Sequence, residues 1–247
     1  MECSKWYKET VIDMKYMGSK RRLWKDIAPF ILENRKDGQC YVEPFCGGCN
    51  SLSNVNGWRL AADINPYLIA MWKGLLNDEK VVFDIDKEYY DKVRKSYRNN
   101  DNTFSDFEKG WVGFMASYNG RFFDGGYSGI SVGRNYIHES MLDIIKQIDK
   151  LQGVEFHCCS YDALIIPKKS IIYCDIPYKD SKQYDRVKFD YDKFYQWCFD
   201  KKSEGHRVYI SEYWMPNDFQ CIWEKEVPIH MNSYKGENRK IEKLYLA

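Results

Sequence analysis

The segment Asp175-Ile176-Pro177-Tyr178 contains the residue types that a protein needs to bind an amino group. It follows the apolar residues 171–174, so the acid stands at the end of a predicted buried strand. Asp175 can accept one hydrogen bond, the carbonyl of Ile176 can accept a second, and Tyr178 offers a stacking face to a planar heterocycle. Taken alone, the segment is also compatible with an ordinary Asp-x-Pro turn after a strand.

A glycine turn, Glu43-Pro44-Phe45-Cys46-Gly47-Gly48, follows another short apolar run. Glycines after a strand let the backbone approach a ligand closely, and a helix N-terminus after such a turn offers unpaired N–H groups. Asp63 ends the next predicted strand, where an acid can accept hydrogen bonds from ribose hydroxyls. Steric packing for the glycines and helix capping for Asp63 are the simpler alternatives.

The cysteines do not predict a metal site. The chain has nine cysteines and four histidines, and Cys46-x-x-Cys49 lacks a second pair at ligand spacing, with only Cys158-Cys159 as potential partners. An odd number of cysteines without dense, even spacing predicts free thiols. No base adjacent to a cysteine marks a catalytic nucleophile.

The charge of the whole chain names no partner. In 247 residues, 37 Lys and Arg oppose 36 Asp and Glu, which gives a net charge of +1. Basic residues nevertheless gather in 15–25 and 92–98, either as solvated helix faces or as surfaces for phosphates. No apolar run approaches the ~20 residues that cross a bilayer, and the first ten residues lack the apolar stretch of a secretory signal.

The order of predicted elements is that of an α/β protein with a doubly wound sheet. We expect helices at 19–35, with Ser19 as N-cap, at 66–76, opened by Asn65-Pro66, and at 88–98. The predicted strands are 40–45, 59–63, 154–159, 171–174, 208–211, 221–227 and 243–246, the last two forming an antiparallel pair at the sheet edge.

A polar and aromatic stretch interrupts this pattern. Residues 77–150 are predicted to form an inserted, mainly helical subdomain, which contains the glycine-rich segment 118–129 and carries an exposed loop or hairpin. The α/β domain would then consist of residues 1–76 and 151–247.

Five motifs, in this order, resemble those of the Dam-type (alpha-arrangement) DNA adenine-N6 methyltransferases. They are Lys15-Tyr16-Met17-Gly18-Ser19-Lys20, Glu43-Pro44-Phe45-Cys46-Gly47-Gly48, Asp63-Ile64-Asn65, Tyr161-Asp162-Ala163 and Asp175-Ile176-Pro177-Tyr178. The resemblance implies a Rossmann-like methyltransferase sheet, S-adenosylmethionine as cofactor and double-stranded DNA as substrate. It assigns 1–76 and 151–247 to the catalytic domain that binds S-adenosylmethionine and 77–150 to the target-recognition insertion, and in this length we expect no fused nuclease. It also implies a cytoplasmic protein of a bacterial or phage-infected cell.

The resemblance assigns roles to individual residues. The catalytic residues would be Asp175, Ile176, Pro177 and Tyr178. The cofactor-binding residues would be Tyr16, Gly18, Lys20, Glu43, Phe45, Gly47, Gly48, Asp63, Ile64, Asp162, Ala163 and Asp175. Candidates for DNA contacts are Arg21, Arg22, Arg94, Tyr118, Asn119, Arg121 and Arg134.

The motifs depart from the family at three positions. Ile176 stands where the family usually has proline, so the accepting carbonyl is kept but the φ restriction is lost, and we expect reduced rigidity with retained chemistry. Ser19 and Cys49 each replace a frequent glycine without removing a functional group. The segment 118–136 resembles the family's DNA-reading hairpin, but its sequence differs from that of better-known members, so the recognition sequence does not transfer.

Other functions remain open at this point. The same acceptors would serve cytosine N4 or an amine in RNA, and Ile176 could mark an inactive protein that binds cofactor and DNA. An NAD-dependent oxidoreductase would need a full G-x-G-x-x-G, which is absent. A monomer and a separate restriction endonuclease as partner are both compatible with the resemblance.

Overall fold

The computed structural model describes residues 13–179, 189–228 and 239–247, which divide into two compact units. The helical unit contains the chain up to Arg22, Gly47–Asn54 and Asn65–Gly153, and the sheet unit contains Leu23–Cys46, Val55–Ile64 and Val154–Ala247. The functional boundaries predicted at 76/77 and 150/151 differ from these limits and stay a prediction.

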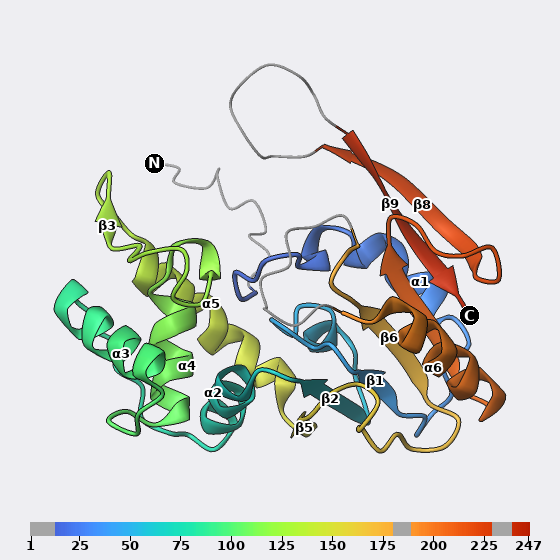
Figure 1. Cartoon of the computed structure of the whole chain (residues 1–247), viewed down its shortest axis with the longest axis horizontal. Helices are drawn as coiled ribbons and strands as arrows, with labels where there is room; N and C mark the ends of the chain where they lie inside the picture. Colours follow the sequence, from blue (N-terminus) through green and yellow to red (C-terminus); the bar gives the residue numbers. More distant parts are fainter. Residues whose placement is uncertain (1–12, 180–188, 229–238) are drawn as a thin grey trace, which may run out of the picture. The chain divides into compact units, whose positions relative to one another are not determined.

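The sheet unit is built on a mostly parallel sheet (Figure 1). Its described strands are β1 Tyr41–Glu43, β2 Arg59–Asp63, β5 Val154–Cys158, β6 Ile171–Asp175, β7 Arg207–Glu212, β8 Gln220–Pro228 and β9 Arg239–Leu246. They are arranged β5-β2-β1-β6-β7-β9-β8, with β9 antiparallel to both of its neighbours. The predicted doubly wound sheet with an antiparallel edge pair is thereby confirmed.

The strand order reverses between β1 and β6. These two strands are parallel neighbours, with Tyr41 opposite Ile171 and Val42 opposite Ile172, although more than a hundred residues separate them in sequence. In doubly wound sheets, ligands bind outside the carboxyl ends of the strands at such a reversal. The topology therefore marks the edge where β1 and β6 end.

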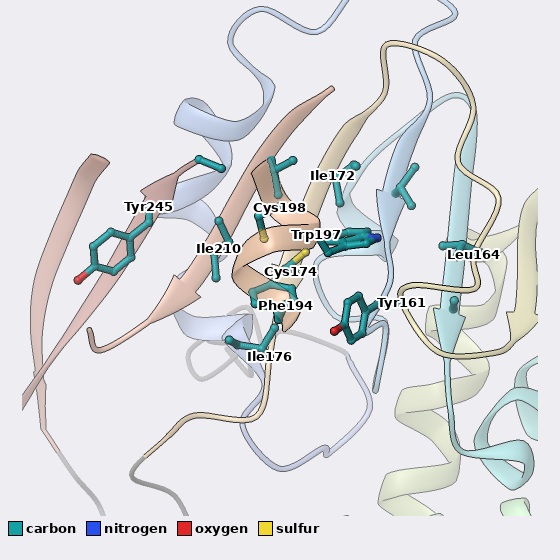
Figure 2. Packing of buried hydrophobic residues seen from close by; sticks show 14 of the residues in the cluster. Tyr161, Leu164, Ile172, Cys174, Ile176, Phe194, Trp197, Cys198, Ile210 and Tyr245 are labelled. Atoms are coloured by element: carbon teal, nitrogen blue, oxygen red, sulfur yellow. The ribbon is translucent and has the colours of Figure 1, made fainter. Parts of the chain in front are cut away.

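Apolar residues on both faces explain why the central strands are buried. On one face, Ile172 and Cys174 of β6 join a buried cluster with Phe194 and Trp197 of α6 Tyr191–Ser203 (Figure 2). On the other face, Tyr173 contacts Trp24 of α1 Trp24–Leu32, with ring centroids 5.9 Å apart. Successive strand residues point to opposite faces, so one uninterrupted apolar run serves both layers.

Two predicted elements are shorter in the structure. The helix expected at 19–35 is a 3₁₀ turn, η1 Lys20–Arg22, followed by α1, and Ser19 caps only the 3₁₀ turn by accepting from the N–H of Arg21 at 3.2 Å. The strand expected at 40–45 ends at Glu43, directly before Pro44, which lacks the N–H that a strand would use.

The helical unit contains α2 Pro66–Leu76, α3 Lys87–Asn99, α4 Asp106–Met115 and α5 Tyr136–Ile148, with short 3₁₀ turns η2 Leu52–Asn54, η3 Tyr118–Gly120 and η4 Asp149–Leu151. The helix predicted at 66–76 is confirmed, and the Asn65 side chain caps it by accepting from the N–H groups of Tyr67 and Leu68. The sequence reading gave no bounds for α4, α5 or α6.

An exposed hairpin lies within 118–136, the segment predicted to resemble a DNA-reading hairpin, and it follows the glycine-rich residues 118–129. Strands β3 Ile130–Ser131 and β4 Arg134–Asn135 form it, and all of its residues are exposed. Within the glycine-rich segment 118–129, Phe123 is buried and stacks on Tyr97 with centroids 5.2 Å apart. Aromatic residues in this segment thus form core, which its glycine content obscured. No helix among the described residues is long and apolar enough to span a membrane.

Candidate active site

Acidic residues end several strands at the carboxyl edge of the sheet. Glu43 ends β1, Asp63 ends β2, Asp175 ends β6 and Glu212 ends β7. Because parallel strands present their carboxyl ends at one edge, the fold brings these side chains to the side where doubly wound proteins bind ligands. Glu212 was missed by sequence reasoning, although it directly follows a predicted strand and so carried the same signal as Asp175.

The backbone of the predicted catalytic segment is tied down on both sides. The Tyr191 hydroxyl donates to the carbonyl of Pro177 at 2.8 Å, and the N–H of Lys179 donates to Glu212 Oε2 at 3.1 Å. Ile176 is buried in the cluster under α6 (Figure 2). Its side chain therefore supplies an apolar anchor at the position where the family usually has proline.

Tyr178 is held in place by its hydroxyl and by its ring. The hydroxyl donates to Glu242 Oε2 at 2.8 Å, and the ring meets Tyr213 edge to face with centroids 4.5 Å apart. Burial, together with the charges of Asp175 and Glu242, raises the pKa of Tyr178 well above its usual value, so the hydroxyl stays protonated. Tyr178 as a whole is only 8% exposed in this arrangement.

The cofactor residues predicted in the sheet unit have different environments. Buried Glu43 accepts a hydrogen bond from the Tyr41 hydroxyl at 2.8 Å, and Phe45 stacks on Tyr161 with centroids 5.4 Å apart. Asp63 is half-buried, whereas Ile64 is exposed. An acid and an aromatic face are thus available from neighbouring strands.

Asp162 and Ala163 lie on the loop after β5, and both are exposed. The Asp162 carboxylate accepts hydrogen bonds from Lys193 of α6 and from the Ser160 hydroxyl. These bonds, that of Lys193 first, lower the pKa of Asp162 and keep it ionised. Asp162 therefore offers a fixed negative charge.

In the helical unit, Tyr16 packs against the glycine turn. A Cβ atom added to Gly47 would lie 2.7 Å from Tyr16 Cε1, and one added to Gly48 would lie 2.6 Å from Tyr16 Cβ. Both glycines are therefore needed for this close approach, and Gly47 also has a φ of +44°. In this structure the two glycines make room for the Tyr16 side chain. The turn then leads into the short 3₁₀ turn η2, where the N-terminus of an α-helix was expected.

The rest of the N-terminal motif is also ordered by local contacts. Gly18 has a φ of +79°, which favours glycine, and a Cβ atom added there would meet no atom within 4 Å outside its chain neighbours. Lys20 is buried, and its ammonium donates to the carbonyl of Gly18 at 3.0 Å. These contacts place Tyr16, Gly18 and Lys20 in one compact turn.

Gln147 is a residue that sequence reasoning missed. It is fully buried near the end of α5, where its Oε1 accepts from the N–H of Met14 at 2.8 Å and its Nε2 donates to the carbonyl of Gly48 at 2.9 Å. The amide thus joins the N-terminal motif to the glycine turn. A signal was present, because Gln147 continues the buried face formed by Ile137, Met141 and Ile144.

The predicted DNA contacts all lie in the helical unit. Arg22, Tyr118, Asn119 and Arg134 are exposed, whereas Arg21, Arg94 and Arg121 are half-buried. Arg134, on the hairpin, is oriented by two bonds to Glu139, at 2.9 Å from Nε and 2.7 Å from Nη2. Within the described part of the chain, no group of three or more His, Cys, Asp or Glu side chains could hold a metal ion, and the cysteines there are not joined to one another by disulfides.

Comparison with known proteins identifies the family of this chain and a bacterial relative. The family model for D12 class N6 adenine-specific DNA methyltransferases matches residues 16–219. A DNA adenine methylase of Haemophilus influenzae is 29% identical over 190 residues, which cover 69% of this chain and 64% of that protein. The chain thus spans slightly less than two thirds of the length of this relative. Because the family model matches most of the chain, the chain belongs to the D12 class N6 adenine-specific DNA methyltransferases.

Proposed function

We propose that this chain transfers a methyl group from S-adenosylmethionine to the exocyclic N6 of an adenine in duplex DNA. Membership of the family implies a methyl donor and a DNA substrate. The observation that carries the proposal is the position of Asp175-Ile176-Pro177-Tyr178, at the carboxyl end of β6, where the strand order reverses.

The residues at this edge suit the proposed cofactor chemically. The half-buried carboxylate of Asp63 can accept hydrogen bonds from ribose hydroxyls, and Phe45 offers an aromatic contact to an adenine ring. When bound, S-adenosylmethionine supplies an electrophilic methyl group on a sulfonium. We assign its binding to the set given by the five motifs, which is Tyr16, Gly18, Lys20, Glu43, Phe45, Gly47, Gly48, Asp63, Ile64, Asp162, Ala163 and Asp175.

The proposed chemistry needs two acceptors in fixed positions. An adenine in a duplex must leave the base stack before an enzyme can reach its amino group, which costs a few kcal/mol. The Asp175 carboxylate and the Ile176 carbonyl then accept the two N6 hydrogens, which raises electron density on the nitrogen. The bonds from Tyr191 and Lys179 hold this backbone in place, so little reorganisation accompanies the reaction.

DNA would be bound by basic and polar groups, most of which belong to the helical unit. The basic runs 15–25 and 92–98, which include Arg21, Arg22 and Arg94, are proposed to contact phosphates. Asn119, Arg121 and Arg134 can donate to base edges, and exposed Tyr118 lies next to them in sequence. Phosphate contacts would fix the position of the protein, and base contacts would set its recognition sequence.

The test is methyl transfer from radiolabelled S-adenosylmethionine to unmethylated DNA, followed by digestion and separation of the nucleosides. We expect label in N6-methyladenosine. Label in N4-methylcytosine, label in RNA only, or cofactor binding without transfer to any DNA would each overturn the proposal.

A matched pair of variants tests the assignment of the catalytic segment. Asp175→Ala should abolish transfer while leaving cofactor binding largely in place, because it removes an acceptor for the amino group. Asp200→Ala removes an exposed carboxylate of α6 that accepts only from surface groups such as Gln196, and it should retain full activity. Equal activity of the two variants would show that the segment has been misassigned.

A further inference from the structure

An exposed tryptophan lies close to the proposed catalytic segment. Trp214, two residues after the end of β7, is 56% exposed, although the next residue, Met215, is buried in the core. Tryptophan is a residue that proteins mostly bury. Among the described tryptophans only Trp58 is comparably exposed, at 43%, and its indole N–H donates to Glu155 at 2.9 Å.

The ring of Trp214 is one side of a cluster of aromatic rings around a lysine. The ammonium of Lys179 lies 5.6 Å from the Trp214 ring and 5.6 Å from the Tyr191 ring. Lys179 is the residue after Tyr178, and the Tyr191 hydroxyl donates to the carbonyl of Pro177. The cluster is therefore continuous with the segment to which the chemistry has been assigned.

A buried carboxylate fixes both segments of this cluster. Glu212 is 2% exposed, its Oε2 accepts from the N–H of Lys179 at 3.1 Å, and its Oε1 accepts from the N–H of Tyr213 at 2.7 Å. A second lysine, Lys240, lies 4.3 Å from the Tyr213 ring. Charge-assisted bonds of this kind are strong, so Trp214 and Lys179 are presented on a held backbone.

We propose that Trp214 and Lys179 form a shelf for an unstacked nucleotide of the substrate DNA, next to the target adenine. Its base would stack on the open face of Trp214, and its phosphate would pair with the Lys179 ammonium. Aromatic rings interleaved with lysines are the surface that binds unstacked nucleotides without reading their sequence. A partner protein that places a cationic side chain on these rings fits less well, because Lys179 and Lys240 of this chain already lie against them. The inference rests on the proposed function, which supplies the unstacked DNA.

The shelf can be tested with a single-stranded oligothymidylate, which contains no adenine to methylate. Addition of this oligonucleotide to the protein should quench the tryptophan fluorescence of the protein. Trp214→Ala should remove most of this quenching and weaken binding about tenfold, since stacking on one ring is worth a factor of this order. Lys179→Gln should lower the slope of log affinity against log salt by about 0.7, the value for one contact to a single strand.

Trp58→Ala is the matched control, because it removes an exposed tryptophan from the same sheet, directly before β2 at the amino edge. It should bind the oligonucleotide as the unaltered chain does. Equal affinity of the Trp58→Ala and Trp214→Ala variants would overturn the shelf, and so would an absence of binding to the unaltered chain. If the unaltered chain bound oligothymidylate but transferred no methyl group to DNA, the proposed function alone would be overturned.

Discussion

The amide of Gln147 allows a sharp test of how the helical unit is held together. Gln147→Ala leaves the N–H of Met14 and the carbonyl of Gly48 without their partner, both in the interior. Each buried group that loses its hydrogen bond costs about 1–3 kcal/mol. The better helix propensity of alanine returns less than about 0.7 kcal/mol. We therefore expect the free energy of unfolding to fall by about 2–5 kcal/mol.

The measurement is urea unfolding followed by circular dichroism, with Gln196→Ala as the matched control. Gln196 is also a helical glutamine, but it is exposed and donates only to Asp200, at 2.8 Å, so its loss should cost less than about 0.5 kcal/mol. Hydrogen exchange gives a local readout, because the N–H of Met14 should lose its protection only in Gln147→Ala. A loss below about 1 kcal/mol, or unchanged protection of Met14, would refute the reasoning.

Three other outcomes are expected. Gly48→Ala places a methyl group 2.6 Å from Tyr16 Cβ, so the free energy of unfolding should fall by about 1–3 kcal/mol and the melting temperature should fall with it. An unchanged melting temperature would contradict this packing. Burial lowers the pKa of His206, whose unprotonated Nδ1 accepts from a backbone N–H at 3.1 Å, so the unfolded chain binds the proton more tightly. The urea midpoint of unfolding should therefore fall as the pH drops through about 6.5, and it should fall less in His206→Gln. An equal fall in this variant would show that His206 does not cause the pH dependence. A thiol reagent should modify exposed Cys158 rapidly and Cys198 only on unfolding, because Cys198 is buried and burial raises its pKa. Peptide mass spectrometry measures the two rates, and equal rates would contradict this expectation.

Local signals in the sequence were enough to predict most of the sheet and the residues at its edge. The run Ile171–Cys174 is apolar throughout because both of its faces are buried, and an acid follows where the strand ends. Asn65-Pro66 starts a helix through its own backbone and side chain, so no distant residue is needed to predict α2. The order of five motifs then identified a family that the comparison with known proteins confirmed.

The contacts that hold the candidate site together could not be predicted in the same way. Glu242 accepts from the Tyr178 hydroxyl across 64 residues, and Gln147 bonds to residues 99 and 133 positions away. The burial of Phe123 likewise depends on a residue remote in sequence, because its ring stacks on Tyr97.

The sequence by itself determined the local features of the fold, because each of them depends on a few adjacent residues. These features are the apolar runs that form strands, the acids that end the strands, the glycine turns and the residues that start helices. Only the tertiary structure decided that Tyr178 donates to Glu242, that Glu212 clamps Lys179 and Tyr213, and that Trp214 stays open to solvent. The physical reason is that a side chain's hydrogen-bond partner and its exposure depend on what packs against it, and packing joins segments whose local patterns carry no record of one another.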